Sequence, residues 1–499
     1  MDHSDAAVIL STLALLFACS SSSDAANPSS ESEAGASGAV TARGGATAIA
    51  GTAGTSSGGA SSVIGSAGSA SSSGGTAGAL GSEVAGSGGS LFSSGGGAGS
   101  ASFGGSSTVS GGASGGGSGG GSTGASHWVG TWTASPYPVP SGNLPPASLS
   151  GSVLRQVTHV SLGGSQIRVQ LSNLSGNGSV SLSAVHVAVC KAAGAVDSTI
   201  DPATDKALTF AGTSAVTIPA GKEIWSDPLD FTIAPLGNLT ITAAFTSVPS
   251  NLTGHAGSRT TSYQQSGSTE VTAASMTSAR TVDSWYYISG IDVMADAAAE
   301  GAVAIGDSIT DGRGTDTNQN NRWTDVLASR LHANAATVDV SMMNQGIGAT
   351  NLVGSGTAAE ARFARDVLGQ SGVKYAIVLD GVNDIGSGQS FANMKAAYDQ
   401  LISAAHAHSV RIYGATILPF GANSYYSAAH ESVRQQVNAY IKGGAFDGYI
   451  DFDAALTDGG NPPKLQTVYA TWAQADGLHP GPAGYQKMGD TVDLSLFTK

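Results

Sequence analysis

The stretch Ala302-Val303-Ala304-Ile305-Gly306-Asp307-Ser308-Ile309-Thr310-Asp311-Gly312 decides how the second half of this 499-residue chain folds. Its first four residues form a short apolar run, typical of a buried strand, and the glycine and polar residues after it predict a turn. Residues 322–332 follow with apolar side chains at helical spacing. A buried strand, a turn and a helix make up one β–α unit.

The same order of strand and helix repeats toward the C-terminus. Further strands are predicted at 338–340, 375–379, 410–413 and 449–452, and further helices at 357–368, 391–407, 427–442 and after Pro482. Such alternation predicts a parallel sheet covered by helices on both faces, with right-handed crossovers. Ligands of these sheets bind beyond the carboxyl ends of the strands, so we expect the chemistry there.

The preceding part of the chain has a different pattern. Segments such as Gln166–Leu171 and Ala184–Val189 alternate in side-chain character at every residue, and glycine- and proline-rich turns separate them. Many short strands of this kind predict a β-sandwich or jelly roll. We therefore predict an all-β domain at residues 127–295 and an α/β domain at residues 296–499.

Residues 1–19 have the character of a secretory signal. The apolar run Ala6–Ala18 is shorter than the about 20 residues that span a bilayer. Leu16-Phe17-Ala18-Cys19 resembles the lipobox of bacterial lipoprotein precursors, which implies that Cys19 carries a lipid. The acidic residues Asp2 and Asp5 and the large Phe17 depart from that pattern, and plain secretion is the alternative.

Residues 20–126 consist almost entirely of Gly, Ser, Ala and Thr. Such a composition cannot bury enough apolar surface to offset the entropy of ordering the chain, so we predict a disordered linker. It would hold the folded part at a distance from a membrane as a flexible tether. A segment without any selected role is the alternative.

Charge and cysteine content exclude several classes of protein. The formal net charge is −14 and no run of Lys or Arg occurs, which argues against nucleic acid or anionic lipid as partners. Two cysteines cannot form a disulfide framework, and Cys190, at a strand end, is expected to be a small buried side chain. No CxxC or HxxxH pair indicates a structural zinc site.

Three predicted strand ends carry polar or glycine residues that could do chemistry. Ser308 follows the first strand, Gly346 the second and Asn383 the third. Each has an ordinary structural alternative: a helix cap for Ser308, a tight turn for Gly346 and a loop contact for Asn383. Their shared position at one edge of the sheet favours a common site.

Asp476-Gly477-Leu478-His479 supplies the groups that a serine nucleophile needs. A serine hydroxyl requires a base within hydrogen-bond reach, and the base requires a carboxylate that fixes its tautomer. Asp476 and His479 can meet across one short loop. The other histidines fall in the predicted signal, in the β-rich part as surface or strand residues, or inside helices: His3, His127, His159, His186, His255, His332, His406, His408 and His430.

Gly306-Asp307-Ser308, Gly346, Gly381-x-Asn383-Asp384 and Asp476-x-x-His479 resemble, in the same order, the four conserved blocks of the SGNH hydrolases, also called GDSL esterases and lipases. The resemblance implies a flavodoxin-like three-layer α/β/α fold and a catalytic triad of Ser308, Asp476 and His479. It further implies an oxyanion hole formed by Ser308, Gly346 and Asn383, with no metal or organic cofactor. Ile309 and Ala349 stand where Leu and Gly are commoner in the family.

The β-rich part adds a second resemblance. Trp128-Val129-Gly130-Thr131-Trp132-Thr133-Ala134-Ser135-Pro136, Leu154-Arg155-Gln156 and Leu171-Ser172-Asn173 are similar to secreted bacterial SGNH esterases that carry an N-terminal β domain. This implies a secreted or envelope-anchored serine esterase that removes acetyl or other short acyl groups from carbohydrate. It would contact a membrane only through an N-terminal lipid.

Two other functions fit the same residues. One is an arylesterase or lipase-type carboxylesterase, and the other is a non-catalytic polysaccharide-binding surface protein. In the second case Trp128, Trp132, Trp225 and Trp285 would offer stacking platforms, although burial in a core is the commoner role of tryptophan. The sugar, the acyl length and the oligomeric state stay open from the sequence.

Overall fold

The structure, a computed structural model, describes residues 125–191 and 197–498. The predicted signal segment, the lipid-bearing Cys19 and the predicted linker up to residue 124 lie outside the described residues. All described residues belong to one compact unit. Within them, no helix has both the length and the apolar character needed to cross a membrane.

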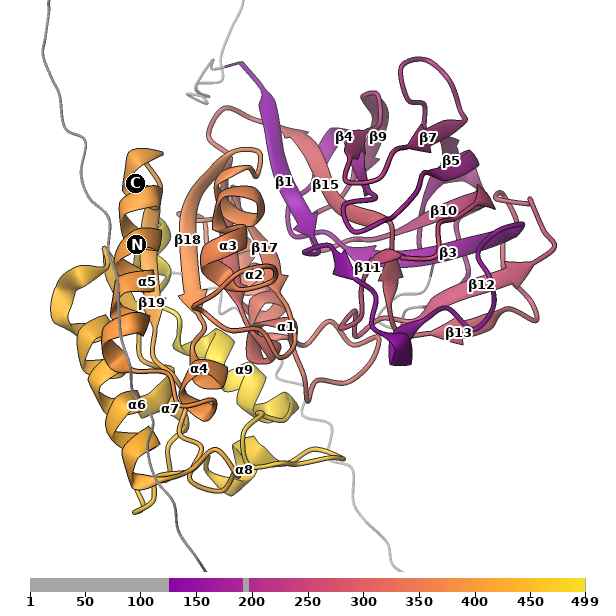
Figure 1. The fold of residues 1–499 in the computed structure, drawn as a ribbon. Helices are drawn as coiled ribbons and strands as arrows, with labels where there is room; N and C mark the ends of the chain where they lie inside the picture. The colour runs from indigo at the N-terminus through magenta and orange to yellow at the C-terminus, as the bar shows by residue number, and fades with distance from the viewer. Residues whose placement is uncertain (1–124, 192–196, 499) are drawn as a thin grey trace, which may run out of the picture. The chain divides into compact units, whose positions relative to one another are not determined.

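A five-stranded parallel sheet forms the core of the C-terminal half (Figure 1). Its strand order is β17-β16-β18-β19-β20, so the second strand along the chain lies outside the first and the others follow on the opposite side. This is the flavodoxin-like order, in which the chain reverses direction beside the first strand. The strands are β16 (Glu300–Gly306), β17 (Val340–Gly346), β18 (Val373–Leu379), β19 (Arg411–Ala415) and β20 (Gly448–Ile450).

Helices cover this sheet on both faces, which gives the predicted three-layer α/β/α fold. Helix α2 packs against α9, and helix α5 packs against α6. With right-handed crossovers, the reversal of strand order places these two pairs on opposite faces. The helices are α1 (Ser308–Asp311), α2 (Trp323–Ala333), α3 (Ala359–Phe363), α4 (Val382–Gly386), α5 (Phe391–Ala407), α6 (Ala428–Tyr440), α7 (Phe452–Leu456), α8 (Thr467–Ala470) and α9 (Pro482–Thr491).

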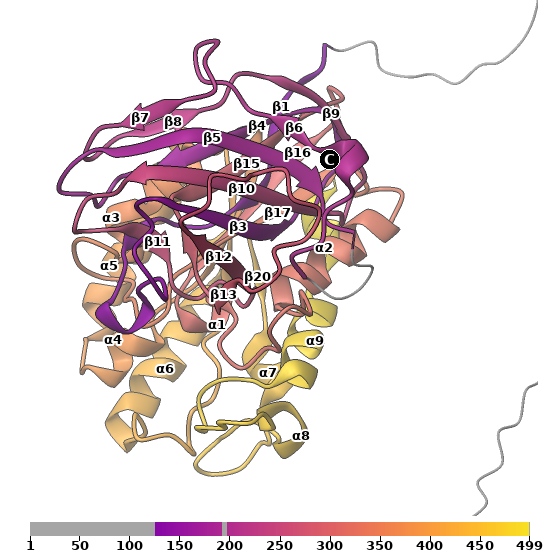
Figure 2. The same cartoon turned by 90° about the vertical axis from the view of Figure 1, so that its right-hand side faces the viewer.

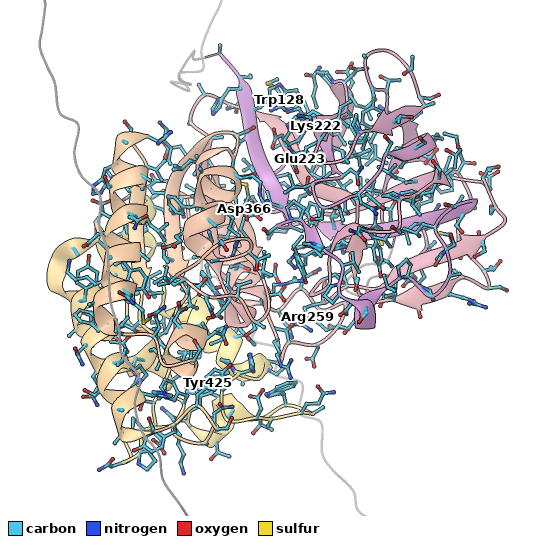
Figure 3. All side chains as sticks on the ribbon, in the orientation of Figure 1. Trp128, Lys222, Glu223, Arg259, Asp366 and Tyr425 are labelled. Carbon is cyan, nitrogen blue, oxygen red and sulfur yellow. The ribbon has the colours of Figure 1, made fainter. Side chains whose placement is uncertain are left out.

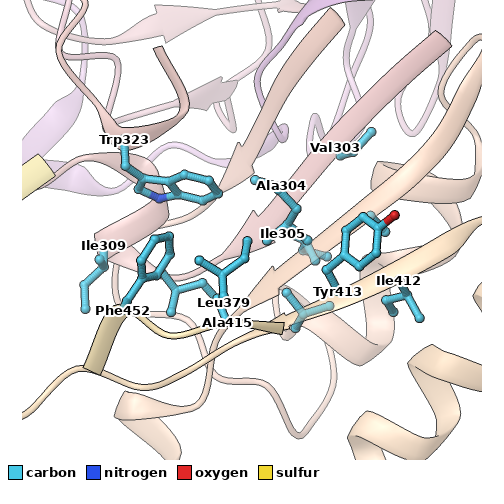
Figure 4. Close-up of a cluster of buried hydrophobic side chains, with 14 of the residues drawn as sticks. Val303, Ala304, Ile305, Ile309, Trp323, Leu379, Ile412, Tyr413, Ala415 and Phe452 are labelled. Atoms are coloured by element: carbon cyan, nitrogen blue, oxygen red, sulfur yellow. The ribbon is translucent and has the colours of Figure 1, made fainter. Parts of the chain in front are cut away.

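The core between these layers is apolar and aromatic (Figure 4). Val303 and Ile305 of β16 are fully buried, as expected for the apolar run that opens the α/β region. Trp323 at the start of α2 is also fully buried, and its ring lies 5.5 Å from that of Phe452.

The N-terminal half consists of antiparallel sheets, as predicted (Figure 2). Two of them share one hydrophobic core, to which Val169 and Val293 contribute from one sheet and Val187 and Ile241 from the other. The first sheet contains β1 (His127–Thr133), β15 (Ile288–Ala295), β4 (Gly164–Ser172), β8 (Glu223–Trp225) and β9 (Leu229–Ile233). The second contains β13 (Arg280–Val282), β12 (Ser262–Ser266), β3 (Ser152–His159), β10 (Asn238–Ser247), β5 (Val180–Val189), β6 (Lys206–Ala207) and β7 (Val216–Ile218). A third, small sheet holds β14 (Trp285–Tyr286), β11 (Thr253–His255) and β2 (Tyr137–Pro138).

Strand β1 joins the antiparallel sheets to the parallel one (Figure 1). The Ser341 hydroxyl of β17 donates to the carbonyl of Gly130 at 2.7 Å, and the Thr133 hydroxyl donates to the carbonyl of Asn344 at 3.2 Å. These bonds link the β-rich half to the outer strand of the parallel sheet. The predicted division of the chain at residues 295 and 296 stays a prediction.

The second parallel strand lies further along the chain than predicted. The sequence pattern indicated a strand at 338–340 that ends toward Gly346, with a tight turn as the structural alternative there, whereas β17 runs from Val340 to Gly346. It pairs in step with β16, from Glu300 opposite Val340 to Gly306 opposite Gly346. Pairing with a neighbouring strand therefore overrides the local turn character of these residues.

Candidate active site

Ser308 lies at the point where strand β16 gives way to helix α1. Asp307 caps this helix, since its carboxylate accepts a hydrogen bond from the Ile309 amide at 2.8 Å. Ser308 is the first residue of the helix and is only 6% exposed. The strand–turn–helix sequence thus places its hydroxyl at the carboxyl edge of the parallel sheet, as predicted.

His479 and Asp476 reach this serine from the loop before α9. The Ser308 Oγ lies 2.7 Å from His479 Nε2, and His479 Nδ1 lies 2.7 Å from Asp476 Oδ2. The second oxygen of Asp476 accepts from the backbone amides of Leu478 and His479, each at 3.0 Å. The carboxylate is therefore fixed by its own loop and holds the imidazole with Nε2 toward the serine.

Burial and pairing shift the pKa values of these two groups in directions that suit a base. Burial lowers the pKa of His479 below its ordinary value of 6.5, and the opposing hydrogen bond and charge of Asp476 do not cancel that effect. Burial alone would raise the pKa of Asp476, but hydrogen bonds and charge from His479 bring it below 3.8. At neutral pH the arrangement therefore pairs a neutral imidazole with a carboxylate.

Asn383 lies on helix α4, and both the nitrogen and the oxygen of its side-chain amide form hydrogen bonds. Its Nδ2 donates to the carbonyl of Thr350 at 2.7 Å, and its Oδ1 accepts from the Tyr425 hydroxyl at 3.1 Å. Tyr425 is labelled in Figure 3. These contacts fix which end of the amide carries the nitrogen and leave its second N–H for another acceptor.

Gly346 does not have a free amide, which corrects its predicted place in an oxyanion hole. Its N–H donates to the Asn344 side chain at 2.8 Å. Its role is steric instead, because a Cβ at this position would lie 2.3 Å from the backbone nitrogen of Asp311. A glycine here allows β17 to approach helix α1 closely.

The loop after β17 contains another candidate donor for the oxyanion hole, the backbone amide of Ala349. Ala349 is exposed and has a φ of 61°, a left-handed conformation that favours glycine. Among residues 125–191 and 197–498 no acceptor is found for its N–H. Thr350, the next residue, is the one whose carbonyl binds Asn383. The signal in the sequence was that Ala349 stands where the family more often has glycine.

Arg313 and Trp472 border the histidine. The Arg313 side chain is half exposed, with Nε 3.8 Å from Asp476 Oδ2 and its guanidinium carbon 6.0 Å from the centre of the Trp472 ring. The Trp472 ring meets that of His479 edge-on at 6.4 Å. Arg313 and Trp472, which lie beside the Ser308–His479–Asp476 relay, therefore both come from the chain's C-terminal half.

Sequence reasoning missed a contact between the β-rich half and the helix that carries Ser308. His255 of strand β11 places Nε2 2.9 Å from Asp311 Oδ1 and Nδ1 3.0 Å from the carbonyl of Ser135. Since both ring nitrogens face acceptors, the ring satisfies both only when each nitrogen carries a proton. The two side chains are 5% and 4% exposed, so this contact is buried.

Two arginines also lie close to Asp311. Arg259 lies 3.6 Å from its second carboxylate oxygen, and Arg322 donates to its backbone carbonyl at 3.1 Å. Burial alone would raise the pKa of Asp311, but the charge and hydrogen bond of His255, with the arginine charges, bring it below its ordinary value. No local pattern marks His255 for this role, because its partners are distant in sequence.

We expect the substitution His255→Ala to lower the free energy of unfolding by about 3 kcal/mol at neutral pH, because it leaves the buried Asp311 carboxylate without its closest partner. The depressed pKa of Asp311 stabilises the wild type above about pH 3.9, and this contribution disappears as the pH falls through the lower folded-state value. The deficit of the variant should therefore shrink only as the pH falls below about 3.9. Urea unfolding at two pH values measures both effects.

The surface pair His406–Asp447 provides the matched control. Its atoms are 3.0 Å apart, but the side chains are 48% and 33% exposed. His406→Ala should cost less than about 1 kcal/mol, since water screens such pairs. Equal costs for the two variants would contradict the role assigned to His255.

Comparison with known proteins identifies one family that matches part of the chain. The family described as GDSL-like Lipase/Acylhydrolase matches residues 304–487. No curated protein matches the chain. No cluster of three His, Cys, Asp or Glu residues that could hold a metal ion is found in the described part of the chain.

Solved structures give weaker similarities. A protein described as lipolytic and of the G-D-S-L family, from Desulfitobacterium hafniense DCB-2, is 21% identical with a TM-score of 0.32, covering 38% of this chain and 96% of its own. A GDSL-like lipase from Bacteroides thetaiotaomicron VPI-5482 is 18% identical with a TM-score of 0.30, covering 40% of this chain and 87% of its own. Similarities at this level carry no weight in the assignment.

The assignment rests on the matched segment itself. It begins within strand β16 and ends within helix α9, so it contains both the turn of Ser308 and the loop of His479. The family match and the geometry converge on the same residues: residues 304–487 match the GDSL-like lipase/acylhydrolase family, the SGNH hydrolases, and the chain is an ester-bond hydrolase.

Proposed function

We propose that this protein is a secreted or surface-tethered serine esterase that removes acetyl or other short acyl groups from carbohydrate. The observation that carries the catalytic part is the continuous relay from Ser308 through His479 to Asp476, with both contacts at 2.7 Å. The carbohydrate part rests on the sequence resemblance of the β-rich half and on the polar surroundings of the relay.

In the first half of the reaction, the Ser308 hydroxyl attacks the ester carbonyl. His479 Nε2 takes the serine proton, and Asp476 stabilises the imidazolium that forms. The imidazolium then gives its proton to the departing alcohol, which leaves the acyl group on Ser308. A water molecule, deprotonated by the same histidine, releases the acid and restores the serine.

The tetrahedral intermediates carry a negative oxygen that needs hydrogen-bond donors. We assign this role to the Ser308 amide, the free N–H of Asn383 and the Ala349 amide. Ala349 replaces Gly346, whose amide is engaged with Asn344. Tyr425 holds the Asn383 amide in the required orientation.

The groups beside the relay favour a short acyl chain over a long one. Arg313 and Asp476 present charge next to His479, and the hydroxyl of Tyr425 borders Asn383. A long hydrocarbon chain would have to desolvate these groups without compensating them. An acetyl group with a hydroxyl-rich leaving group makes no such demand.

The location outside the cytoplasm belongs to the proposal as well. It depends on residues 1–19 as a signal and on Cys19 as the site of lipid attachment. The Gly- and Ser-rich residues 20–126 would then tether the enzyme near polymeric substrate. Mass spectrometry of the mature protein would reveal a lipid on Cys19, or an unmodified new N-terminus if the protein is simply secreted.

The ester panel that tests the activity compares the full chain with its Ser308→Ala variant. The substrates are p-nitrophenyl esters from acetate to laurate, together with acetylated xylan. We expect the wild type to act best on acetate and on xylan, and the variant to act on none. Preference for laurate would favour a lipase, and preference for aryl esters without release of acetate from xylan would favour an arylesterase. Equal inactivity of both proteins would contradict the esterase.

The pH profile tests His479 as the base. Because burial holds the pKa of His479 below 6.5, kcat/KM should stay level down to about that pH and fall below it, where the imidazole takes up a proton. The measurement is kcat/KM on p-nitrophenyl acetate across the acid range. Asp307→Asn, which keeps the helix cap while removing a second buried carboxyl with a raised pKa, should leave the midpoint unchanged. A midpoint above 7 would contradict this role of His479.

A further inference from the structure

A polar cavity lies between the β-rich half and the parallel sheet, and it is lined by residues that the proposed reaction does not use. Its volume is about 290 Å³, near the lower end of the range of small-molecule sites. The β-rich half contributes Arg168, Glu223 and Trp225, and the C-terminal half contributes Gln345, Arg365 and Gln370. Trp128, Glu223 and Asp366 are labelled beside strand β1 in Figure 3.

Charge pairing in this cavity argues against an anionic ligand. Arg168 forms an ion pair with Asp292 at 2.7 Å, and Arg365 forms one with Asp366 at 2.5 Å. Each of these two guanidinium groups is therefore paired with a carboxylate, although Arg365 shares Asp366 with the buried Arg362. Glu223 adds a further acidic group, and burial is the main cause that raises its pKa. No unpaired cation remains among these lining groups to hold a phosphate or a carboxylate.

Apart from the two arginine–carboxylate pairs, much of the cavity wall consists of planar amide and carboxyl side chains. Gln345 is 2% exposed, and its Oε1 has no hydrogen-bond partner in the described part of the chain. A buried acceptor without a donor costs free energy unless a ligand or water supplies one. Amide and carboxyl groups offer paired donors and acceptors, which match the adjacent hydroxyl groups of a sugar ring.

An aromatic platform completes the cavity. The Arg168 guanidinium carbon lies 4.5 Å from the centre of the Trp225 ring and 4.8 Å from that of Trp128. This packing fixes Trp225 at the cavity wall while its side chain stays partly exposed. A rigid indole beside several planar polar groups suits a ligand with both C–H and O–H faces.

We propose that this cavity is a non-catalytic binding site for a neutral sugar unit of a polysaccharide. It is separate from the Ser308 relay, because none of the residues that line it belongs to that relay. One residue that lines the cavity, Gln345, is nevertheless linked through Arg362 to the turn that carries Ser308. Arg362 is buried and bonds to the carbonyls of Gln345 at 2.5 Å and Gly306 at 2.9 Å, and to Asp366 at 3.0 Å. A polysaccharide held there would keep the enzyme on its polymer.

Isothermal titration calorimetry of the full chain with xylotriose, cellotriose and mannotriose tests the site, with trigalacturonic acid as the anionic comparison. We expect at least one neutral trisaccharide to bind with a Kd of about 1 mM or tighter. Glu223→Ala and Trp225→Ala should each weaken that binding at least about fivefold, by removing a hydrogen-bonding group and the platform. Lys222→Ala is the control: it changes an exposed neighbour of Glu223 that lies outside the cavity, and it should leave sugar binding unchanged.

Activity on p-nitrophenyl acetate separates this proposal from the proposed function, because both cavity variants should keep kcat/KM within about twofold of the wild type. Thermal unfolding checks that they remain folded, and if Trp225→Ala does not, Glu223→Ala and Gln370→Ala decide the question. Absence of binding by every neutral sugar, binding that neither variant weakens, or equally tight binding of trigalacturonic acid would each overturn the site while leaving the esterase intact.

Discussion

Ser308→Ala should lower kcat on p-nitrophenyl acetate by a factor on the order of 10⁵, the largest effect expected of any single substitution in this protein. The variant removes the only atom that can form the acyl-enzyme in the proposed mechanism. The substrate would still meet the oxyanion donors and His479, so a small residual rate above the uncatalysed reaction should remain. Steady-state and stopped-flow kinetics measure the loss of turnover and of the initial burst.

The double variant Ser308→Ala, His479→Ala shows whether the two residues act as a unit. If they do, it should be no slower than the single variants by more than about threefold, because each substitution already removes the whole nucleophilic step. The melting temperature of Ser308→Ala should change little, since the hydroxyl is lost from a helix start that Asp307 continues to cap. A Ser308→Ala variant that keeps a tenth of the wild-type kcat would rule out the serine as nucleophile.

Asn383→Ala should lower kcat about 10²–10³-fold while KM changes little, because the lost donor acts on the oxyanion of the transition state rather than on the bound ester. The same substitution removes the bond to the Thr350 carbonyl. The division of the effect between kcat and KM is therefore the decisive readout. A loss of less than about threefold in kcat would remove Asn383 from the oxyanion hole.

Two further variants distinguish the Asn383 amide, which donates to the oxyanion in the proposed mechanism, from Tyr425, which orients that amide. Asn383→Asp keeps the shape but replaces the amide nitrogen by an acceptor, so its loss should match or exceed that of the alanine variant. Tyr425→Phe removes the hydroxyl that orients the amide and should cost about tenfold or less, since the donor itself remains. A larger loss in Tyr425→Phe than in Asn383→Ala would mean that the tyrosine, and not the asparagine, contacts the substrate.

Several parts of this structure follow from local sequence. The apolar run before Gly306 is strand β16, and the predicted helix at 391–407 is α5. Cys190 is 6% exposed, in line with its expected packing role. The relay could be anticipated because Asp476 and His479 lie on one short loop, and because carboxyl ends of parallel strands converge on one edge.

Other parts could not be foreseen, for identifiable reasons. The amide of Gly346 was available by sequence, but the side chain two residues earlier binds it. Ala349 adopts a left-handed φ of 61° that its side chain disfavours, and the only hint in the sequence was that the family more often has glycine there. The lining of the sugar-sized cavity comes from segments on both sides of the predicted domain boundary.

Local sequence is therefore enough to predict the order of β–α units, the antiparallel character of the first half, and the nucleophile, base and carboxylate that we propose. Periodicity, turn residues and short-range spacing carry that information, because each depends on neighbours along the chain. Which amides stay free, and the pairing of His255 in the β-rich half with Asp311 at the end of helix α1, 56 residues away, depend instead on the folded chain. Such pairings depend on how distant segments pack, and burial turns them into strong interactions only once the chain has folded.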